Sequence, residues 1–388
     1  GMDSSSVVCM ARDFFALERR TEKLITLSLV YQMPSLVEET DYIQMVVDQK
    51  GAIAPYYLDG DTALDFQWFS EKIPEHDEPY PGLFHLAMEK CLVDLAGQLG
   101  VTTILSGGGA ELIVEGNRFH LADLVRRGHW KAALKEARHW AYAKNKSLWS
   151  VLRELAIEPN IPAILREGFS TLCTRGYGHW PKLGLFTIPP WVFPDFAKEY
   201  NMWDKALTTI RQLNQYPLEQ SFNLLGLRTA TGNWASWYLG TLLGIQICKP
   251  FLDPRLITYC LSLPREFREI PGVPKPLLHM AMQGILPEPI RTRRFKGHFN
   301  EVYWNGLAQN LPALEEMVHQ SGIDKLEIFD KQQLILVLQQ HAIGIGDLRN
   351  GSRICRSLAL IAWFDQMEKV LQNSVEQPTE TYLTRIEA

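Results

Sequence analysis

The chain has 388 residues, and its 39 lysines and arginines stand against 44 aspartates and glutamates, which gives a formal net charge of −5. That balance excludes the basic face on which nucleic-acid binding depends. Hydrophobic residues make up 46% of the chain, a share that excludes a wholly disordered protein. The length predicts one large domain or two intimate domains. No apolar run is long enough to cross a membrane and the N-terminus carries no secretory signal, so we expect a cytoplasmic protein without a membrane partner.

The six cysteines form no CxxC pair, which argues against a zinc site, and the chain is too long for a scaffold held by disulfides. Free cysteine packs as a small hydrophobe, and thiols inside cells stay reduced. We therefore expect buried free thiols at positions 9, 91, 173, 248, 260 and 355.

The first third of the chain alternates helical and strand patterns. Apolar residues recur at helical spacing in some segments, and short β-rich apolar runs lie between them. The helical segments are 6–20, 42–49 and 84–99, and the strand segments are 23–31, 53–58 and 101–105. This alternation predicts an α/β part, a parallel sheet covered by helices, over residues 1–117.

Helical patterns dominate from about residue 118 to the end. The segments are 121–127, 130–142, 147–156, 218–240, 253–263, 275–283 and 331–341, with helical character continuing through 367. Stretches rich in proline at 157–163 and 184–194 are typical of connectors. We expect residues 118–388 to form a mainly helical part that completes a cleft at the carboxyl ends of the strands.

The opening residues, GMDSSS, resemble the end of a phosphate-binding loop that leads into a helix. In the pyrophosphate loop of ATP pyrophosphatases, a strand and Ser-Gly-Gly-x-Asp-Ser precede a helix whose N-terminus holds the anion. Gly1 would then be the last glycine, Asp3 the acid that meets magnesium or pyrophosphate, and Ser4 a hydroxyl donor. Asp3 or Ser4 would also cap the helix. On these six residues alone, a plain helix cap behind a tag remnant is the stronger interpretation.

Further segments carry a family pattern. Residues 104–112 (ILSGGGAEL) follow a strand, as the loop Ser-Gly-x-Gly-Gly-Asp-Glu-Leu does in asparagine synthetase. Residues 246–253 (QICKPFLD) match Glu-x-Arg-x-Pro-Phe-Leu-Asp, residues 275–279 are similar to Lys-x-x-Leu-Arg, and residues 293–296 fit Arg-x-x-Lys. Over nearly the whole chain, the sequence resembles the synthetase domain of asparagine synthetase. It looks closest to the asparagine synthetase-like ATP enzymes that include lasso-peptide macrolactam cyclases and β-lactam synthetase.

The resemblance implies a parallel-sheet core of the adenine nucleotide alpha hydrolase-like (ATP pyrophosphatase) type with a large helical region, and it implies ATP and Mg²⁺ as cofactors. In such enzymes ATP activates a carboxylate as an acyl-adenylate, pyrophosphate leaves, and an amine or ammonia attacks to form an amide. Carried over by position, the cofactor-binding residues would be Gly1, Asp3, Ser4, Ser5, Leu27, Leu29, Ser106, Gly107, Gly108, Gly109 and Lys275.

The resemblance also implies particular roles. Leu27 and Leu29 would line the adenine through their backbone, and Asp3 and Glu111 would be the metal ligands. The catalytic residues would be Glu111 and Lys296, of which Lys296 would contact the developing pyrophosphate. The alternative for Lys296 is a place in a solvated basic surface run.

The chain departs from the family pattern at several positions. Ala110 and Glu111 replace Asp-Glu in a loop that is one residue short, and His279 replaces an arginine. Gln246 stands for a glutamate and Cys248 for an arginine, so removal of a proton from the attacking amine lacks the expected base. The chain also starts inside the phosphate loop, which leaves out the first strand. We expect either a native gene that extends upstream or a rearranged sheet.

Three functions follow from these observations. The first is an AMP-forming amide synthetase of the asparagine synthetase type, without its glutaminase domain, acting either on free aspartate with ammonia or on a peptide as a macrolactam cyclase does. The second is a degenerate domain that binds a partner or peptide without catalysis. The third is a nucleotide-binding regulatory module. An upstream glutaminase domain or a precursor peptide would be the expected partner.

Overall fold

The computed structural model describes residues 1–49, 51–69, 78–115, 119–143, 145–161, 188–202, 205, 223–224, 226–228, 234–294, 297–346 and 350–376. The chain divides into two compact units. The first consists of Gly1–Asp59, Leu92–Thr187 and Asn201–His298, and the second of Gly60–Cys91, Ile188–Tyr200 and Phe299–Ala388. The predicted division at residue 117 was based on a change from α/β to helical structure, whereas these two units are defined by which residues contact each other. The predicted division is therefore not tested and stays a prediction. None of the helices in the described ranges is long and apolar enough to cross a membrane.

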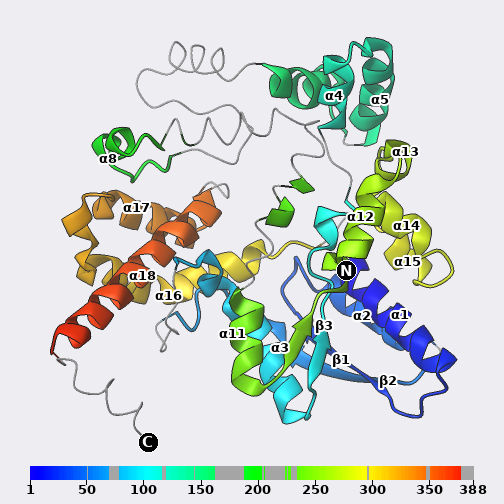
Figure 1. Cartoon of the computed structure of the whole chain (residues 1–388), viewed down its shortest axis with the longest axis horizontal. Helices are drawn as coiled ribbons and strands as arrows, with labels where there is room; N and C mark the ends of the chain where they lie inside the picture. The colour runs from blue at the N-terminus through cyan, green and yellow to red at the C-terminus, as the bar shows by residue number, and fades with distance from the viewer. Residues whose placement is uncertain are drawn as a thin grey trace, which may run out of the picture. The chain divides into compact units, whose positions relative to one another are not determined.

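In the first unit, β1 (Leu24–Val30) and β2 (Ile53–Asp59) pair in parallel along their whole length. Both are the long apolar runs that the sequence predicted as strands. Helices α1 (Met2–Leu17) and α2 (Glu38–Val47) contact each other and pack on β1 (Figure 1). Because parallel strands need a crossover between them, α2 follows β1 and leads the chain back to β2.

A second parallel pair joins β3 (Thr103–Leu105) to β4 (Gln246–Cys248). Helix α11 (Trp234–Leu243) packs against β4 (Figure 1). The expectation of a single sheet is wrong for the described residues, whose strands form two sheets of two strands each. No strand in these ranges links the β1–β2 pair to the β3–β4 pair, so the two pairs do not join into one sheet. Strand β4 was not predicted, since three residues are too few to show a period.

The core of the first unit joins α1 to the segments that follow β4. Its buried members include Cys9 of α1, Phe251, Cys260 of α12 (Pro254–Ser262) and Leu278 of α14 (Pro276–Ala281). Asp253 caps α12, because its side chain accepts a hydrogen bond from the Arg255 backbone nitrogen at 2.8 Å. This packing places the start of α1 and the turn after β4 in one core.

Helices α4 (His120–Arg126), α5 (Trp130–Ala143) and α6 (Leu148–Val151) form a further cluster of the first unit and match the predicted segments. Alanines 133, 137 and 141 give α5 a narrow buried face. The buried His120 lies 2.9 Å from Glu136 of α5 and contacts Glu269, which follows α13 (Arg265–Arg268). Helix α15 (Glu288–Arg291) completes the described helices of this unit after α14. Of the predicted helix 218–240, residues 218–222, 225 and 229–233 lie outside the described residues, and its end from residue 234 lies in α11.

The second unit is helical. Helix α8 (Pro194–Glu199) begins at the end of a predicted connector, and α17 (Lys331–Ala342) and α18 (Gly351–Glu376) match the predicted C-terminal helices. Helix α16 (Asn300–Gln320) was not predicted, because Gly306 and Pro312 inside it are helix-breaking signals. Helix α3 (Leu86–Gln98) runs across the boundary at which the chain divides. The expectation of buried free thiols is confirmed for Cys9, Cys260 and Cys355. Cys91 and Cys248 are free but only half-buried, and Cys173 lies outside the described residues.

Candidate functional site

Helix α1 begins at Met2, earlier than predicted, and Gly1 is its N-cap without a side-chain hydrogen bond. The prediction that Asp3 or Ser4 caps this helix is therefore wrong, because both residues already lie in its first turn. The Ser4 hydroxyl instead donates to the Gly1 carbonyl at 3.3 Å, and the neighbouring Ser5 is buried. A helix start without a side-chain cap leaves backbone N–H groups and the positive end of the helix dipole available to an anion.

Asp3 forms an ion pair with Lys275, the residue that precedes α14. The side chains are 18% and 16% exposed, so the pair is only partly open to water. Lysine Nζ contacts Oδ2, whereas Oδ1 is buried and has no hydrogen-bond partner among the described residues. Lys275 also adopts a left-handed backbone conformation, with φ at 48°, which costs a non-glycine residue about 1–3 kcal/mol. An orphaned carboxylate oxygen beside a strained lysine is typical of a site that a ligand completes.

The glycines of the loop after β3 have different surroundings. A Cβ on Gly107 would lie 2.5 Å from the backbone nitrogen of Ser4, and a Cβ on Gly109 would lie 2.5 Å from Leu252. Gly109 also has a φ of +86°. A Cβ on Gly108 would meet nothing closer than 3.5 Å. Gly107 and Gly109 are thus required by the chain's own packing, and Gly108 is the member of the triplet on which a Cβ would fit without a clash.

The same loop is tied to β4 and to its own turn. The Ser106 backbone nitrogen donates to the Cys248 carbonyl at 2.8 Å, which extends the β3–β4 ladder by one residue. The Ser106 hydroxyl accepts a hydrogen bond from the Gly108 nitrogen at 3.2 Å. Lys249, which follows β4, lies against Gly108. Sequence analysis missed Lys249; the available signal was its position next to Cys248, where the family pattern has its cation.

The other predicted site residues are less closely connected. Glu111 is exposed in the turn after the glycines, and Leu27 and Leu29 are half-buried in β1, opposite Tyr56 and Leu58 of β2. In the part of the chain that the structure describes, no three histidines, cysteines or acids are placed to hold a metal ion. A pair of carboxylates is smaller than such a group, so the metal-ligand prediction for Asp3 and Glu111 stays a prediction. Lys296 lies outside the described residues.

The residues on either side of Lys296 are nevertheless anchored. Glu39 of α2 accepts a hydrogen bond from the Gly297 nitrogen at 3.0 Å and pairs with Arg293 at 2.8 Å. Burial opposes the charge on Glu39, but Arg293 and the Gly297 nitrogen outweigh it and hold the pKa of that carboxyl below its usual value. The Arg293 guanidinium also lies 4.0 Å from the centre of the Tyr42 ring. Glu39 was not predicted, since more than 250 residues separate it from its partners.

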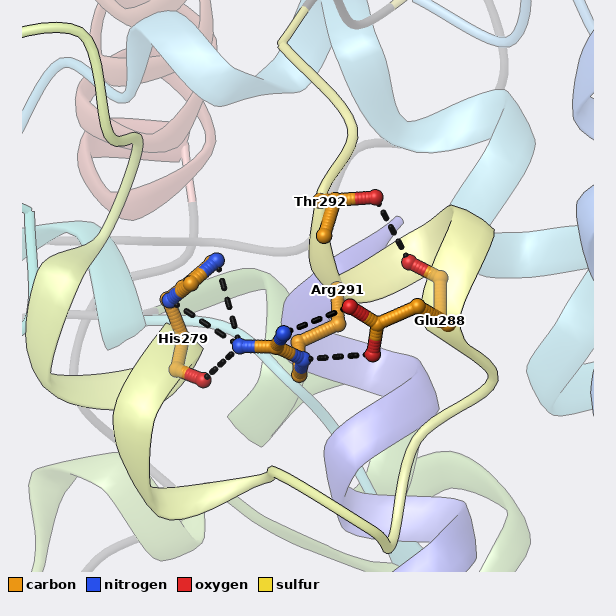
Figure 2. Close-up of polar contacts among 4 residues, drawn as sticks. All are labelled: His279, Glu288, Arg291 and Thr292. Atoms are coloured by element: carbon orange, nitrogen blue, oxygen red, sulfur yellow. Dashed lines mark hydrogen bonds and ion pairs between the residues drawn. The ribbon is translucent and has the colours of Figure 1, made fainter.

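His279, one helical turn after Lys275, lies against Arg291 (Figure 2). Arg291 Nη1 is 3.1 Å from Nδ1 of the ring and donates to the His279 carbonyl at 3.0 Å, while the rest of the guanidinium binds Glu288 at 2.6 and 2.8 Å. Burial, and next the charge of Arg291, lower the pKa of His279. A neutral imidazole accepts a hydrogen bond from the guanidinium, so Arg291 brings a cation to a position where the family pattern has one.

The chain was compared with curated proteins and with protein families. A comparison with curated proteins finds no match to the chain. The chain matches the protein family described as asparagine synthase over residues 1–179 and 242–365, which include α1, the glycine loop and the segment after β4. The matched residues make up more than three quarters of the sequence. The chain therefore belongs to the asparagine synthase family, which implies an ATP-dependent amide synthetase kind of activity.

Proposed function

We propose that this protein is an ATP-dependent, AMP-forming amide-bond synthetase. A carboxylate attacks the α-phosphorus of ATP, the bond from that phosphorus to the bridging oxygen breaks, and pyrophosphate leaves. An amine then attacks the acyl-adenylate, and AMP leaves as the amide forms. The observation that carries the proposal is the close approach of Gly107 to the first turn of α1, because it joins the glycine loop to the Asp3–Lys275 pair.

The residues of this region suit a phosphate chain. The uncapped start of α1 offers backbone N–H donors, and Lys275 supplies a positive charge close to them. Asp3 retains a buried oxygen without a partner, which is the kind of hard ligand that Mg²⁺ prefers. Mg²⁺ would neutralise charge on the phosphates as pyrophosphate leaves. Asp3 and the start of α1 would hold this group, and Lys275 would orient the Asp3 carboxylate.

The proton that the attacking amine loses needs an acceptor other than the residue at position 246. Gln246 cannot accept it, because an amide has no basic site near neutral pH. We infer that the amine enters already neutral and that the proton it loses as the amide forms passes to a group on the substrate, such as a phosphate oxygen of the departing AMP. Both a free amino acid with ammonia and a peptide meet this condition, so the acid and the amine stay open. The helical segment near residues 127–140 resembles the macrolactam cyclases most, which favours the peptide.

A second function, binding of a partner or peptide without catalysis, is favoured by the exposed Glu111 and by Gln246. One measurement separates the two. Exchange of labelled pyrophosphate into ATP, with mixtures of amino acids or peptides as carboxylate donors, is expected to occur in the wild type. Asp3→Asn should reduce it at least tenfold, since the negative charge and one of the two carboxylate oxygens are lost. Binding of Mg·ATP without exchange in any mixture would favour the second function, and no binding at all would rule out the first.

A further inference from the structure

Lys249 is a cation at the open edge of the candidate nucleotide site that the family pattern does not account for. It follows β4 directly, and the parallel register sets Cys248 opposite Leu105 at the end of β3. Ligands of parallel sheets bind where the strands end at their carboxyl side. The glycine loop and Lys249 therefore leave the same edge of the β3–β4 sheet.

The stem of Lys249 runs along Gly108. Its Cε and Cδ atoms would lie 3.6 and 3.7 Å from a Cβ on that glycine, which is ordinary van der Waals contact. Gly108 is also the member of the triplet on which a Cβ would fit without a clash, since Gly107 is packed against Ser4 and Gly109 against Leu252. The ammonium group at the end of this stem consequently borders the half-buried glycine loop.

The two lysines near α1, Lys275 and Lys249, differ in whether an acidic side chain neutralises their charge. Lys275 is neutralised by Asp3, whereas Lys249 makes no ion pair with any described residue. Close to it in the chain, Cys248 has replaced the arginine of the family pattern. A half-buried lysine that has no counter-ion among the described residues, and whose stem lies against the glycine loop, is arranged to receive an anion.

We propose that Lys249 binds the pyrophosphate portion of ATP and stabilises it as the leaving group, an inference that rests on the proposed function. Pyrophosphate is the part of the nucleotide concerned, because Gly107, next to Gly108, touches the first turn of α1, where the phosphate chain is expected. The lysine moves no proton. It places a positive charge where negative charge accumulates when the bond to the bridging oxygen breaks.

The test is calorimetric titration of the full chain with Mg·ATP, inorganic pyrophosphate with Mg²⁺, and AMP. Lys249→Met keeps the stem that packs on Gly108 and removes only the charge. Loss of one charge-assisted contact is expected to weaken Mg·ATP and pyrophosphate about tenfold or more, and to leave AMP within about twofold. Lys249→Arg should recover most of the affinity, since it restores the charge. Lys135→Met, which changes an exposed lysine of α5 without an ion pair, is the matched control and should bind as the wild type does.

The outcomes separate the inference from the function on which it rests. Equal affinity of wild type and Lys249→Met for Mg·ATP and pyrophosphate would overturn the inference and leave the synthetase proposal standing. An equal loss for AMP would also overturn it, because the variant would then have disturbed the site as a whole. A wild type that binds none of the three ligands would overturn the proposed function and the inference together. Thermal unfolding of each variant verifies that it is folded.

Discussion

Two aspartates, one in each unit, have similar neighbours but differ in how their carboxylate oxygens are hydrogen-bonded. Asp3 packs against Gly107 and pairs with Lys275; Asp65 packs against Gly306 and pairs with His85 at 2.9 Å. In each case a glycine from a distant segment lets the backbone of the aspartate come close. The difference lies in the carboxylate oxygens, because Asp3 keeps a buried oxygen without a partner and Asp65 does not.

That difference indicates which pair serves the fold and which serves a ligand. The His85 ring joins Asp65 through one nitrogen and approaches the Cys355 sulfur at 3.6 Å through the other, so the second unit closes its own network. A buried acceptor left open costs about 1–3 kcal/mol. A protein retains such a cost where binding offsets it, so we propose that the Asp3 pair serves binding and the Asp65 pair serves stability.

The largest effects are expected from the two glycines. A Cβ on Gly306 would lie 2.1 Å from the Asp65 carbonyl oxygen and one on Gly107 would lie 2.5 Å from the Ser4 nitrogen, so backbone must move in both. We expect Gly306→Ala and Gly107→Ala each to lower the free energy of unfolding by about 3 kcal/mol. Gly108→Ala, which meets no atom within 3.4 Å, is the control and should change it by less than about 0.5 kcal/mol.

Chemical denaturation of the three glycine variants measures these changes. Titration of the folded fraction with Mg·ATP then distinguishes the two units, because Gly306→Ala should bind normally and Gly107→Ala should not. Normal binding by Gly107→Ala would show that the glycine loop and α1 do not form one site.

The substitutions Asp3→Asn and Asp65→Asn should have smaller effects than the glycine substitutions, and the two should affect different properties: Asp65→Asn the stability and Asp3→Asn the binding of Mg·ATP. Asp65 is 8% exposed, and losing its charge weakens a closed network, so we expect about 1–2 kcal/mol of lost stability with nucleotide binding intact. Asp3→Asn should change stability by less than about 1 kcal/mol, because the wild-type carboxylate is already incompletely satisfied, while binding of Mg·ATP falls at least tenfold. Denaturation midpoints and calorimetry on the same samples test both. If Asp3→Asn were as destabilising as Asp65→Asn, the distinction between the pairs would be lost.

Much of this comparison was out of reach of sequence reasoning. Strands β1 and β2 were predicted because each has seven residues of β-rich, apolar character, and the site around Asp3 and the glycine loop followed from the family resemblance. Strand β4, with three residues, and α16, with its internal proline, carry no clear periodic signal. Pairs such as Lys275 with Asp3 and Arg293 with Glu39 depend on the folding together of segments over 250 residues apart, which no local pattern reports.

The smallest effect concerns two histidines whose pKa values move in opposite directions. Burial works against a charged His85, but Asp65 and then Cys355 outweigh it and raise the pKa of His85 to about 10. Its contribution to stability is therefore complete below the ordinary value of 6.5 and is lost as the pH rises toward 10. The pKa of His279 is lowered, so its contribution is complete above 6.5 and is lost as the pH falls below that value.

Differences in unfolding midpoint between wild type and single variants isolate each histidine from the other titrating groups. The advantage of wild type over His85→Gln should shrink between pH 7 and pH 10, by a modest amount because the ring is 44% exposed and solvent screens its charge. The advantage over His279→Gln should shrink between pH 7 and pH 5, because a protonated ring repels Arg291. If both differences moved in the same direction with pH, at least one ring would have the wrong charge in this account. If the advantage of wild type over His279→Gln did not change with pH, the imidazole ring would not help to hold Arg291. Glu288 and the His279 carbonyl would then be sufficient to keep this cation in place.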